Sequence, residues 1–204
     1  MGLAPVALFV YNRPWHTRET VTALQNNTLA SQTDLYIFSD APRNEAAVQQ
    51  VSEVREYIRT IRGFRNVFIT ERNENYGLAR SIVSGVTQII ETHGRVIVLE
   101  DDLLTHPQFL EFMNMGLEKY RGHSEVYSIT GYSFIRNKKR SDPGQTIANV
   151  SYFLSIISSW SWATWADKWK VFDKFPADTD ILAQDRKRRR EFNFNNSYPY
   201  YKML

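Results

Sequence analysis

The sequence has no cysteine among its 204 residues, so disulfide frameworks, thiolate metal sites and cysteine nucleophiles are excluded. It also has no apolar run close to the roughly 20 residues that a membrane-spanning helix needs. No basic stretch followed by an apolar stretch opens the chain, so we expect no signal peptide. Together these absences predict a cytoplasmic protein, either free or held at the surface of a membrane.

Several common motifs for nucleotide binding and hydrolysis are missing as well. Neither the GxGxxG pattern nor the P-loop pattern occurs, which argues against the usual dinucleotide and P-loop sites. The four histidines are scattered and form no HExxH pair, which argues against a histidine-bound zinc ion. No GxSxG turn supports a serine hydrolase.

Basic charge is concentrated in one place. Five consecutive basic residues, 186–190, carry more positive charge than the net +3 of the whole chain, so the remainder is slightly acidic. A protein that binds nucleic acid usually spreads its basic residues over one face. We therefore interpret the run as a solvated helix face, and binding to nucleic acid or to an anionic membrane is the less favoured alternative.

The apolar residues suffice for a folded core and follow alternating strand and helix patterns. Hydrophobic residues make up 43% and aromatic residues 14% of the chain, which excludes a disordered protein. Continuous apolar runs predict buried parallel strands, and apolar residues three and four apart predict amphipathic helices. The alternation predicts an α/β fold, a Rossmann-like and mostly parallel sheet flanked by helices. The predicted strands are 6–11, 35–38, 67–70 and 95–99, and the predicted helices are about 15–26, 48–61, 78–90 and 107–117.

The pattern changes in the last third of the chain. Residues 126–130 and 152–157 predict further strands, and the polar stretch 136–144 between them predicts a loop. Trp162, Trp165 and Trp169 recur three and four residues apart. This spacing predicts a helix with most of its tryptophan side chains in the core.

Polar side chains follow the predicted strands at their carboxyl ends. Ligands of open α/β sheets bind outside those ends. We therefore predict a ligand site at this edge of the sheet. The residues in question are Asn12 and Arg13 after the first strand, Asp40 after the second, and Glu100, Asp101 and Asp102 after the fourth.

The three adjacent carboxylates are the strongest indication of a ligand. At one strand end they repel each other, and leaving them unpaired in a partly buried crevice is costly. A hard divalent cation, Mg²⁺ or Mn²⁺, relieves the repulsion and typically binds through one or two carboxylates plus substrate phosphates. A solvated acidic turn or a helix N-cap cluster is the alternative.

The other candidates are individually weaker. Asp40 either accepts hydrogen bonds from a nucleotide or forms the turn that follows it. Arg13 either meets a base or a diphosphate or is a surface residue beside a turn. Gly77 either lets a ligand approach the backbone or only supplies an unusual backbone angle. Arg80 lies in the first turn of a predicted helix, where anions are favoured.

Five segments, in order along the chain, resemble GT-A glycosyltransferases. Within that group the sequence is most similar to the family-2 transferases and to N-acetylglucosaminyltransferase I, which carries a Glu-Asp-Asp version of the usual DxD motif. The resemblance covers roughly residues 5–170. The segments are Pro5–Arg13, Phe38–Asp40, Asn75–Ser81, Val96–Leu103 and Pro107–Phe109.

The resemblance implies a role for each candidate. The ligand would be a nucleoside-diphosphate sugar, most simply a UDP-sugar, bound with Mn²⁺ or Mg²⁺, and Asp102 would be the direct metal ligand. Arg13 and Asp40 would hold the uridine, and Glu100 and Asp101 would contact the ribose and the donor sugar. Trp162 falls in a segment similar to one that shapes the sugar pocket. The expected nucleotide-sugar-binding residues are Asn12, Arg13, Asp40, Gly77, Arg80, Glu100, Asp101 and Trp162.

The same resemblance implies the reaction. The chain would be a hexosyl- or N-acetylhexosaminyltransferase that moves a sugar, with inversion, to the hydroxyl of a glycan or lipid-linked acceptor in bacterial polysaccharide biosynthesis. Such enzymes use a carboxylate base later in the chain, and nothing after Trp169 matches that segment. We therefore expect residues 1–122 to form the nucleotide-sugar-binding half of a GT-A domain. Residues 123–204 would form an incomplete acceptor-side part, with the catalytic base outside the chain.

Two other functions stay open. A sugar nucleotidyltransferase would use a similar crevice and metal, but it usually has a glycine-rich loop after the first strand, which Asn12-Arg13-Pro14 lacks. A non-catalytic nucleotide-sugar or glycan-binding module would need no base.

Overall fold

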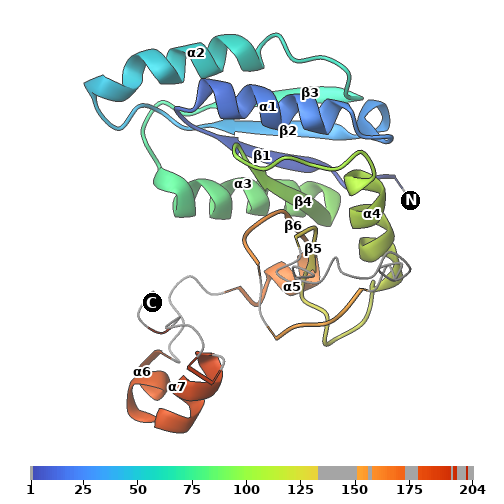
Figure 1. Cartoon of the computed structure of the whole chain (residues 1–204), viewed down its shortest axis with the longest axis vertical. Helices are drawn as coiled ribbons and strands as arrows, with labels where there is room; N and C mark the ends of the chain where they lie inside the picture. The colour runs from blue at the N-terminus through green and yellow to red at the C-terminus, as the bar shows by residue number, and fades with distance from the viewer. Residues whose placement is uncertain are drawn as a thin grey trace, which may run out of the picture. The chain divides into compact units, whose positions relative to one another are not determined.

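The computed structural model describes residues 2–132, 151–155, 158–172, 179–193, 195–196 and 201 (Figure 1). The chain divides into two compact units, residues 1–170 and 171–204. The first unit holds the whole sheet. The described part of the second unit contains α6 (Thr179–Gln184) and α7 (Arg186–Phe192). No described helix is long and apolar enough to cross a membrane.

The first unit is an α/β fold built on a six-stranded, mostly parallel sheet. The strand order is β3-β2-β1-β4-β6-β5, in which the first four are parallel and β6 runs antiparallel to both neighbours. The strands are β1 (Val6–Val10), β2 (Asp34–Ser39), β3 (Asn66–Glu71), β4 (Arg95–Glu100), β5 (Ile129–Thr130) and β6 (Trp162–Trp165).

Helices cover both faces of this sheet, which is why every residue of β1 is buried. One core cluster joins β1, β2 and β4 to α1, α2 and α4, and the other joins the opposite face to α3. Figure 1 shows α1 and α2 on one side of the strands and α3 on the other. The helices are α1 (Pro14–Gln25), α2 (Val48–Ile58), α3 (Gly77–His93), α4 (Phe109–Lys119) and α5 (Ala166–Trp169), with 3-10 turns at Ala30–Gln32 and Glu45–Ala47.

Three of the helix ends are formed by residues that suit those positions. Pro14 begins α1, where its missing N–H costs no hydrogen bond. Gly94 ends α3 with a left-handed φ of +72°, a conformation that other residues adopt only at a cost. The basic run of residues 186–190 forms most of α7, and the Asp185 carboxylate caps that helix by accepting the N–H groups of Lys187 and Arg188.

The last third of the first unit differs from the sequence prediction. The tryptophan-rich segment is not a helix: residues 162–165 form β6, and only residues 166–169 form a short helix. The predicted strand at 126–130 is reduced to β5, and residues 151–155 are not a strand. Residues 156–157 and the predicted loop at 136–144 lie outside the described residues. The helix prediction was wrong because tryptophans three and four residues apart also fit a strand that continues directly into a helix.

The domain boundary predicted at 122/123 does not coincide with the boundary between the compact units, and it stays a prediction. Strands β5 and β6 belong to the same sheet as β1–β4, because β6 pairs with β4 from Arg95↔Trp165 to Val98↔Trp162. The part of the chain beyond the predicted boundary therefore completes the sheet of the first unit.

Helix α3 approaches the sheet closely at a glycine. The rings of Phe9 and Phe38 stack with centroids 5.1 Å apart, and α3 crosses them at Gly85. A Cβ atom at this position would lie 2.8 Å from the Phe9 ring and 3.0 Å from the Phe38 ring. The missing side chain of Gly85 thus sets how near α3 lies to β1 and β2.

We expect Gly85→Val to destabilise the fold by about 1–3 kcal/mol, because two stacked rings cannot yield to the added methyl groups. Gln88→Val, on the exposed side of the same helix, is the matched control and should cost less. Urea unfolding followed by circular dichroism measures both. Equal stability of the two variants would show that α3 is not held at this distance.

Candidate functional site

The strand order reverses between β1 and β4, and the predicted site lies at that point. The chain leaves β1 toward β2 on one side, whereas β4 lies on the other side and pairs with β1 from Val6↔Ile97 to Phe9↔Glu100. Such a reversal opens a crevice outside the carboxyl ends of the two strands, where open α/β sheets bind ligands. The residues directly after β1 and β4 therefore meet at this edge of the sheet.

Arg13 and the acidic cluster are in contact at this edge. The Arg13 Nη1 atom lies 2.8 Å from Asp102 Oδ2 and 3.8 Å from Asp101 Oδ1. The side chains of Arg13 and Asp102 are half-exposed, at 52% and 43%, whereas that of Asp101 is only 9% exposed. One guanidinium group thus partly balances carboxylates that the chain places next to each other.

Burial dominates the electrostatics of the cluster. Loss of hydration raises the pKa of Asp101, and the Tyr11 N–H and the Arg13 charge oppose that rise. The Tyr11 N–H donates to Asp101 Oδ2 at 3.2 Å. The pKa of Glu100 is also raised, first by burial and then by the neighbouring charges of Asp102 and Asp101. The ionised form of the cluster is therefore unfavourable, and a bound cation would make it more favourable.

The donor set suits a hard cation only in part. Within the described residues there is no group of three or more His, Asp or Glu side chains that could hold a metal ion by themselves. Mg²⁺ and Mn²⁺ prefer oxygen ligands and often take only one or two carboxylates, with phosphates and water completing the shell. Asp102, being exposed and at the strand end, fits such a site when a bound diphosphate supplies the other oxygens.

Asp40 lies at the end of β2 and is bound entirely to backbone. Its Oδ1 atom accepts the N–H groups of Ala41 at 3.0 Å and Tyr76 at 2.9 Å, and its Oδ2 atom accepts that of Gly77 at 2.9 Å. The residue is 6% exposed. The carboxylate thus caps the first turn of α3 and fixes the turn that precedes it, in the manner of an N-terminal cap.

Gly77 has a left-handed φ of +69° and no atom within 4 Å of its missing Cβ. This glycine is required by the backbone conformation and not by a close neighbour. Arg80, one turn later, forms an exposed ion pair with Glu74 at 3.2 Å, and its guanidinium lies 3.7 Å from the centre of the Tyr76 ring. Gly77 and Arg80 therefore lie in the first turn of α3, directly after the loop that Asp40 organises.

Asn12 and Trp162 lie on different elements, and among the described residues neither forms a hydrogen bond or ion pair with Arg13 or the acidic cluster. The Asn12 amide donates to Gln50 of α2 at 3.3 Å on the surface. Trp162 pairs with Val98 near the carboxyl end of β4, and its ring stacks on Trp169 at 5.9 Å on the face covered by α3. The sugar contact predicted for Trp162 and the nucleotide contacts predicted for the other residues remain predictions.

Two residues that the sequence analysis missed hold the edge together. Tyr11 joins the loops after β1 and β2, because its hydroxyl accepts the Arg43 N–H at 2.9 Å while its own N–H holds Asp101. The Arg72 guanidinium lies 4.0 Å from the centre of the Tyr76 ring and donates to Ser84 Oγ at 2.8 Å. Nothing in the spacing of the sequence distinguishes these two side chains from ordinary loop residues.

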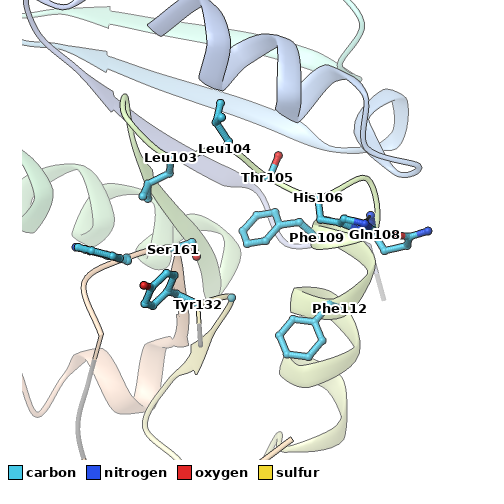
Figure 2. Close-up of a pocket in the computed structure, with 11 residues that line it drawn as sticks. Leu103, Leu104, Thr105, His106, Gln108, Phe109, Phe112, Tyr132 and Ser161 are labelled. Carbon is cyan, nitrogen blue, oxygen red and sulfur yellow. Dashed lines mark hydrogen bonds between the residues drawn. The ribbon is translucent and has the colours of Figure 1, made fainter. Parts of the chain in front are cut away.

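A cavity of about 390 Å³ is lined in part by the loop that follows the acidic cluster (Figure 2). Its first lining residue, Leu103, directly follows Asp102. Aromatic rings from the start of α4 face residues that follow β5 and precede β6. The lining consists of Leu103, Leu104, Thr105, His106, Gln108, Phe109, Phe112, Gly131, Tyr132, Trp160 and Ser161.

Known proteins offer only distant likenesses to this chain. No protein-family model matches it, and no curated protein matches it in sequence. A mannosyltransferase from Pyrobaculum calidifontis in complex with GDP-Man and Mn²⁺ is 15% identical over 63% of this chain and 35% of its own, with a TM-score of 0.44. The chain thus spans about a third of the length of that enzyme.

Two further solved structures cover more of the chain. A candidate nucleotide-diphospho-sugar transferase from Desulfovibrio desulfuricans G20 is 12% identical over 88% of this chain and 68% of its own, with a TM-score of 0.47. A 4-diphosphocytidyl-2C-methyl-D-erythritol synthase is 13% identical over 85% and 82%, with a TM-score of 0.44. Sequence identity and TM-score are both low for these structures, so the function has to be argued from the site.

We expect Asp40→Asn to destabilise the fold by about 1–3 kcal/mol, because an amide cannot accept three N–H groups and turns a donor toward one of them. Glu74→Gln, an exposed carboxylate in the same loop, is the control and should cost little. Hydrogen exchange should show faster opening of the Tyr76 and Gly77 amides in the first variant alone. Unchanged exchange there would mean that Asp40 does not hold this turn.

Asp101→Asn is expected to stabilise the protein at neutral pH by about 0.5–2 kcal/mol, the usual range for a single stabilising substitution. The pKa of Asp101 is raised in the folded state, so its ionised form opposes folding above that pKa. This opposition disappears as the pH falls through the folded pKa toward the unfolded value. The stability difference between variant and wild type should therefore shrink on acidification, as measured by urea unfolding across a pH series.

Proposed function

We propose that this chain is the nucleotide-sugar-binding part of a GT-A glycosyltransferase. The observation that carries the proposal is the meeting of Arg13 with Asp101 and Asp102 where the strand order reverses. At the carboxyl ends of the strands, the guanidinium of Arg13 can hold a negatively charged diphosphate, and the two carboxylates can hold the metal ion bound to that diphosphate.

Arg13 would bind the diphosphate. Its side chain is half-exposed, and its present partner Asp102 is half-exposed as well, so the ion pair is weak and open to exchange. A diphosphate offers the guanidinium planar, two-point contacts that a single Asp oxygen does not. Release of Arg13 would leave Asp102 available to a cation.

Asp102 is the proposed ligand of Mn²⁺ or Mg²⁺, and the neighbouring Glu100 and Asp101 are more buried than it is. When bound, such a metal would neutralise the charge that develops on the departing diphosphate. Asp101 would act from its buried position, because its oxygens already interact with the Tyr11 N–H and Arg13. Glu100 and Asp101 are the residues proposed to reach the ribose and the donor sugar.

Asp40 is proposed to act through the loop that it caps. Its oxygens accept backbone N–H groups, so it would position Tyr76, Gly77 and Arg80 beside the nucleotide. Asn12, at the other wall, would complete the nucleotide site.

The proposed reaction moves a hexosyl or N-acetylhexosaminyl group from a nucleoside-diphosphate sugar, in the first place a UDP-sugar, to the hydroxyl of a glycan or lipid-linked acceptor with inversion. No residue described at this edge is assigned as the catalytic base. A cytoplasmic setting, at or near a membrane where bacterial polysaccharides are made, is part of the same proposal.

The decisive experiment is calorimetric titration of UDP into the 204-residue chain, with and without Mn²⁺. We expect binding that needs the metal and that falls at least about tenfold in Asp102→Ala, equivalent to about 1.4 kcal/mol. Asp167→Ala, an exposed acidic residue outside the crevice, is the control and should bind like the wild type.

Titrations with GDP, dTDP and CTP complete the design. Metal-dependent binding of another nucleoside diphosphate would keep the glycosyltransferase proposal and change its donor. Preferential binding of CTP would favour the nucleotidyltransferase alternative. Absence of binding for all four nucleotides, with and without Mn²⁺, would refute the proposal.

A further inference from the structure

The two outer strands of the sheet differ in how much edge they leave open. The sheet ends at β3 on one side and at β5 on the other, as Figure 1 shows. Strand β5 is two residues long, whereas β3 is six residues long. Among the strands that the structure describes, none pairs with the outer side of β3. An edge of this length presents backbone N–H and C=O groups to which another strand can bind.

Strand β3 lacks the features that usually protect an edge. Its interior, residues 67–70, reads Val-Phe-Ile-Thr, which favours a strand and contains no proline, glycine or charge. No residue of β3 is buried, whereas every residue of β1 is. Phe68 is 44% exposed, and its ring stacks on that of Tyr36 with centroids 4.6 Å apart. An aromatic side chain is thus accessible at an unprotected edge.

We propose that β3 pairs antiparallel with the β3 strand of a second copy of this chain. The pair would be a two-fold symmetric dimer in which two sheets become one. Hydrogen bonds between the two backbones would satisfy the outer N–H and C=O groups of both copies. This dimer needs no nucleotide, so the inference does not rest on the proposed function.

The register of the pair follows from the residues that would lie opposite each other. Side chains directly opposite in an antiparallel pair lie on the same face of the sheet, so a symmetric pair has to be centred on one residue. Centring on Phe68 places this ring beside its own copy and places Val67 opposite Ile69. Asn66 then lies opposite Thr70. Aromatic, aliphatic and polar side chains each meet their own kind.

The charges at the strand ends match in the same register. Arg65, which directly precedes β3, would lie opposite Glu71 of the second copy. The Arg65 side chain is 49% exposed and donates through Nε to Asp34 at 2.8 Å, and Glu71 accepts Arg59 Nη2 at 2.7 Å. Pairing would therefore extend both ion pairs into a row of alternating sign, twice in the dimer. Opposite charges across strands are stabilising, and this self-complementarity favours a second copy over an unrelated partner.

The two neighbouring registers match less well. Centring on Ile69 places Val67 opposite the charged Glu71, and centring on Val67 places Phe68 opposite the polar Asn66. Both also leave Arg65 without an acidic residue opposite it. The strand therefore favours a single register, which a cross-link can test.

Analytical ultracentrifugation of the full chain from about 5 to about 200 µM measures the association, over the micromolar range of small interfaces. We expect a monomer–dimer equilibrium that Phe68→Lys weakens at least about tenfold, because two like charges would face each other at the centre of the pair. Met115→Lys is the matched control. Met115 is 65% exposed on α4, a helix joined to β6 by the 3.1 Å hydrogen bond from Trp165 Nε1 to the Leu117 carbonyl. This variant should associate like the wild type.

Disulfide cross-linking tests the register, because the chain has no cysteine of its own. Asn66→Cys and Thr70→Cys would place two Cα atoms about 4.5–5.5 Å apart across the pair, within reach of a disulfide. Two copies of the same variant would hold their thiols about 13 Å apart. Under mild air oxidation, a mixture of the two variants should form linked dimers at least about tenfold faster than either variant alone.

A chain that stays monomeric over this concentration range would overturn the inference. A dimer that Phe68→Lys leaves intact, or single cysteine variants that cross-link as fast as the mixture, would overturn it as well. Circular dichroism shows whether Phe68→Lys folds, and the cysteine mixture decides if it does not. A monomer that binds UDP with Mn²⁺ keeps the proposed function and loses this inference, and a dimer that binds no nucleotide does the opposite.

Discussion

The parallel pairing of β1 with β4 is the constraint on which the rest of the site depends. Both strands are covered by helices on both faces, so their interior residues are apolar and the charged residues lie at or beyond the strand ends. Pairing in register from Val6↔Ile97 brings the residues that follow each strand to the same edge. Arg13 meets the acidic cluster for this reason, although almost ninety residues separate them in the chain.

Two buried carboxylates at opposite ends of the strands, Asp34 and Asp101, have pKa values that shift in opposite directions. Asp34 begins β2 and is paired with Arg65, which lowers its pKa, so that it stabilises the fold at neutral pH and loses this effect as the pH falls through its folded pKa. Asp101 directly follows β4 and has a raised pKa, so its ionised form opposes folding under the same conditions. One carboxylate supports the structure, whereas the other is kept at a cost in stability, which is typical of residues retained for binding or chemistry.

Sequence reasoning was reliable where the physics is local. Apolar runs and periodic stripes predicted β1 to β4 and the helices between them, and the strand-end rule brought Arg13 and Asp102 together. It failed at Trp162, where the same spacing fits a strand, and the cavity depends on pairings that no single segment shows. For Asp40, a nucleotide contact and a turn-forming role leave the same trace in the sequence, and the hydrogen bonds were needed to show the backbone cap.

Asn27 ties the last turn of α1 to the loop after β4 and to the start of α4, since its side chain also donates to the Ala23 carbonyl at 3.0 Å. The loop is therefore not an independent module that can be exchanged between relatives. A graft that replaces residues 103–108 would have to supply a new acceptor for the side-chain amide of Asn27, which lies just after the end of α1. A change in the shape of this loop would therefore need paired changes at two distant places in the sequence.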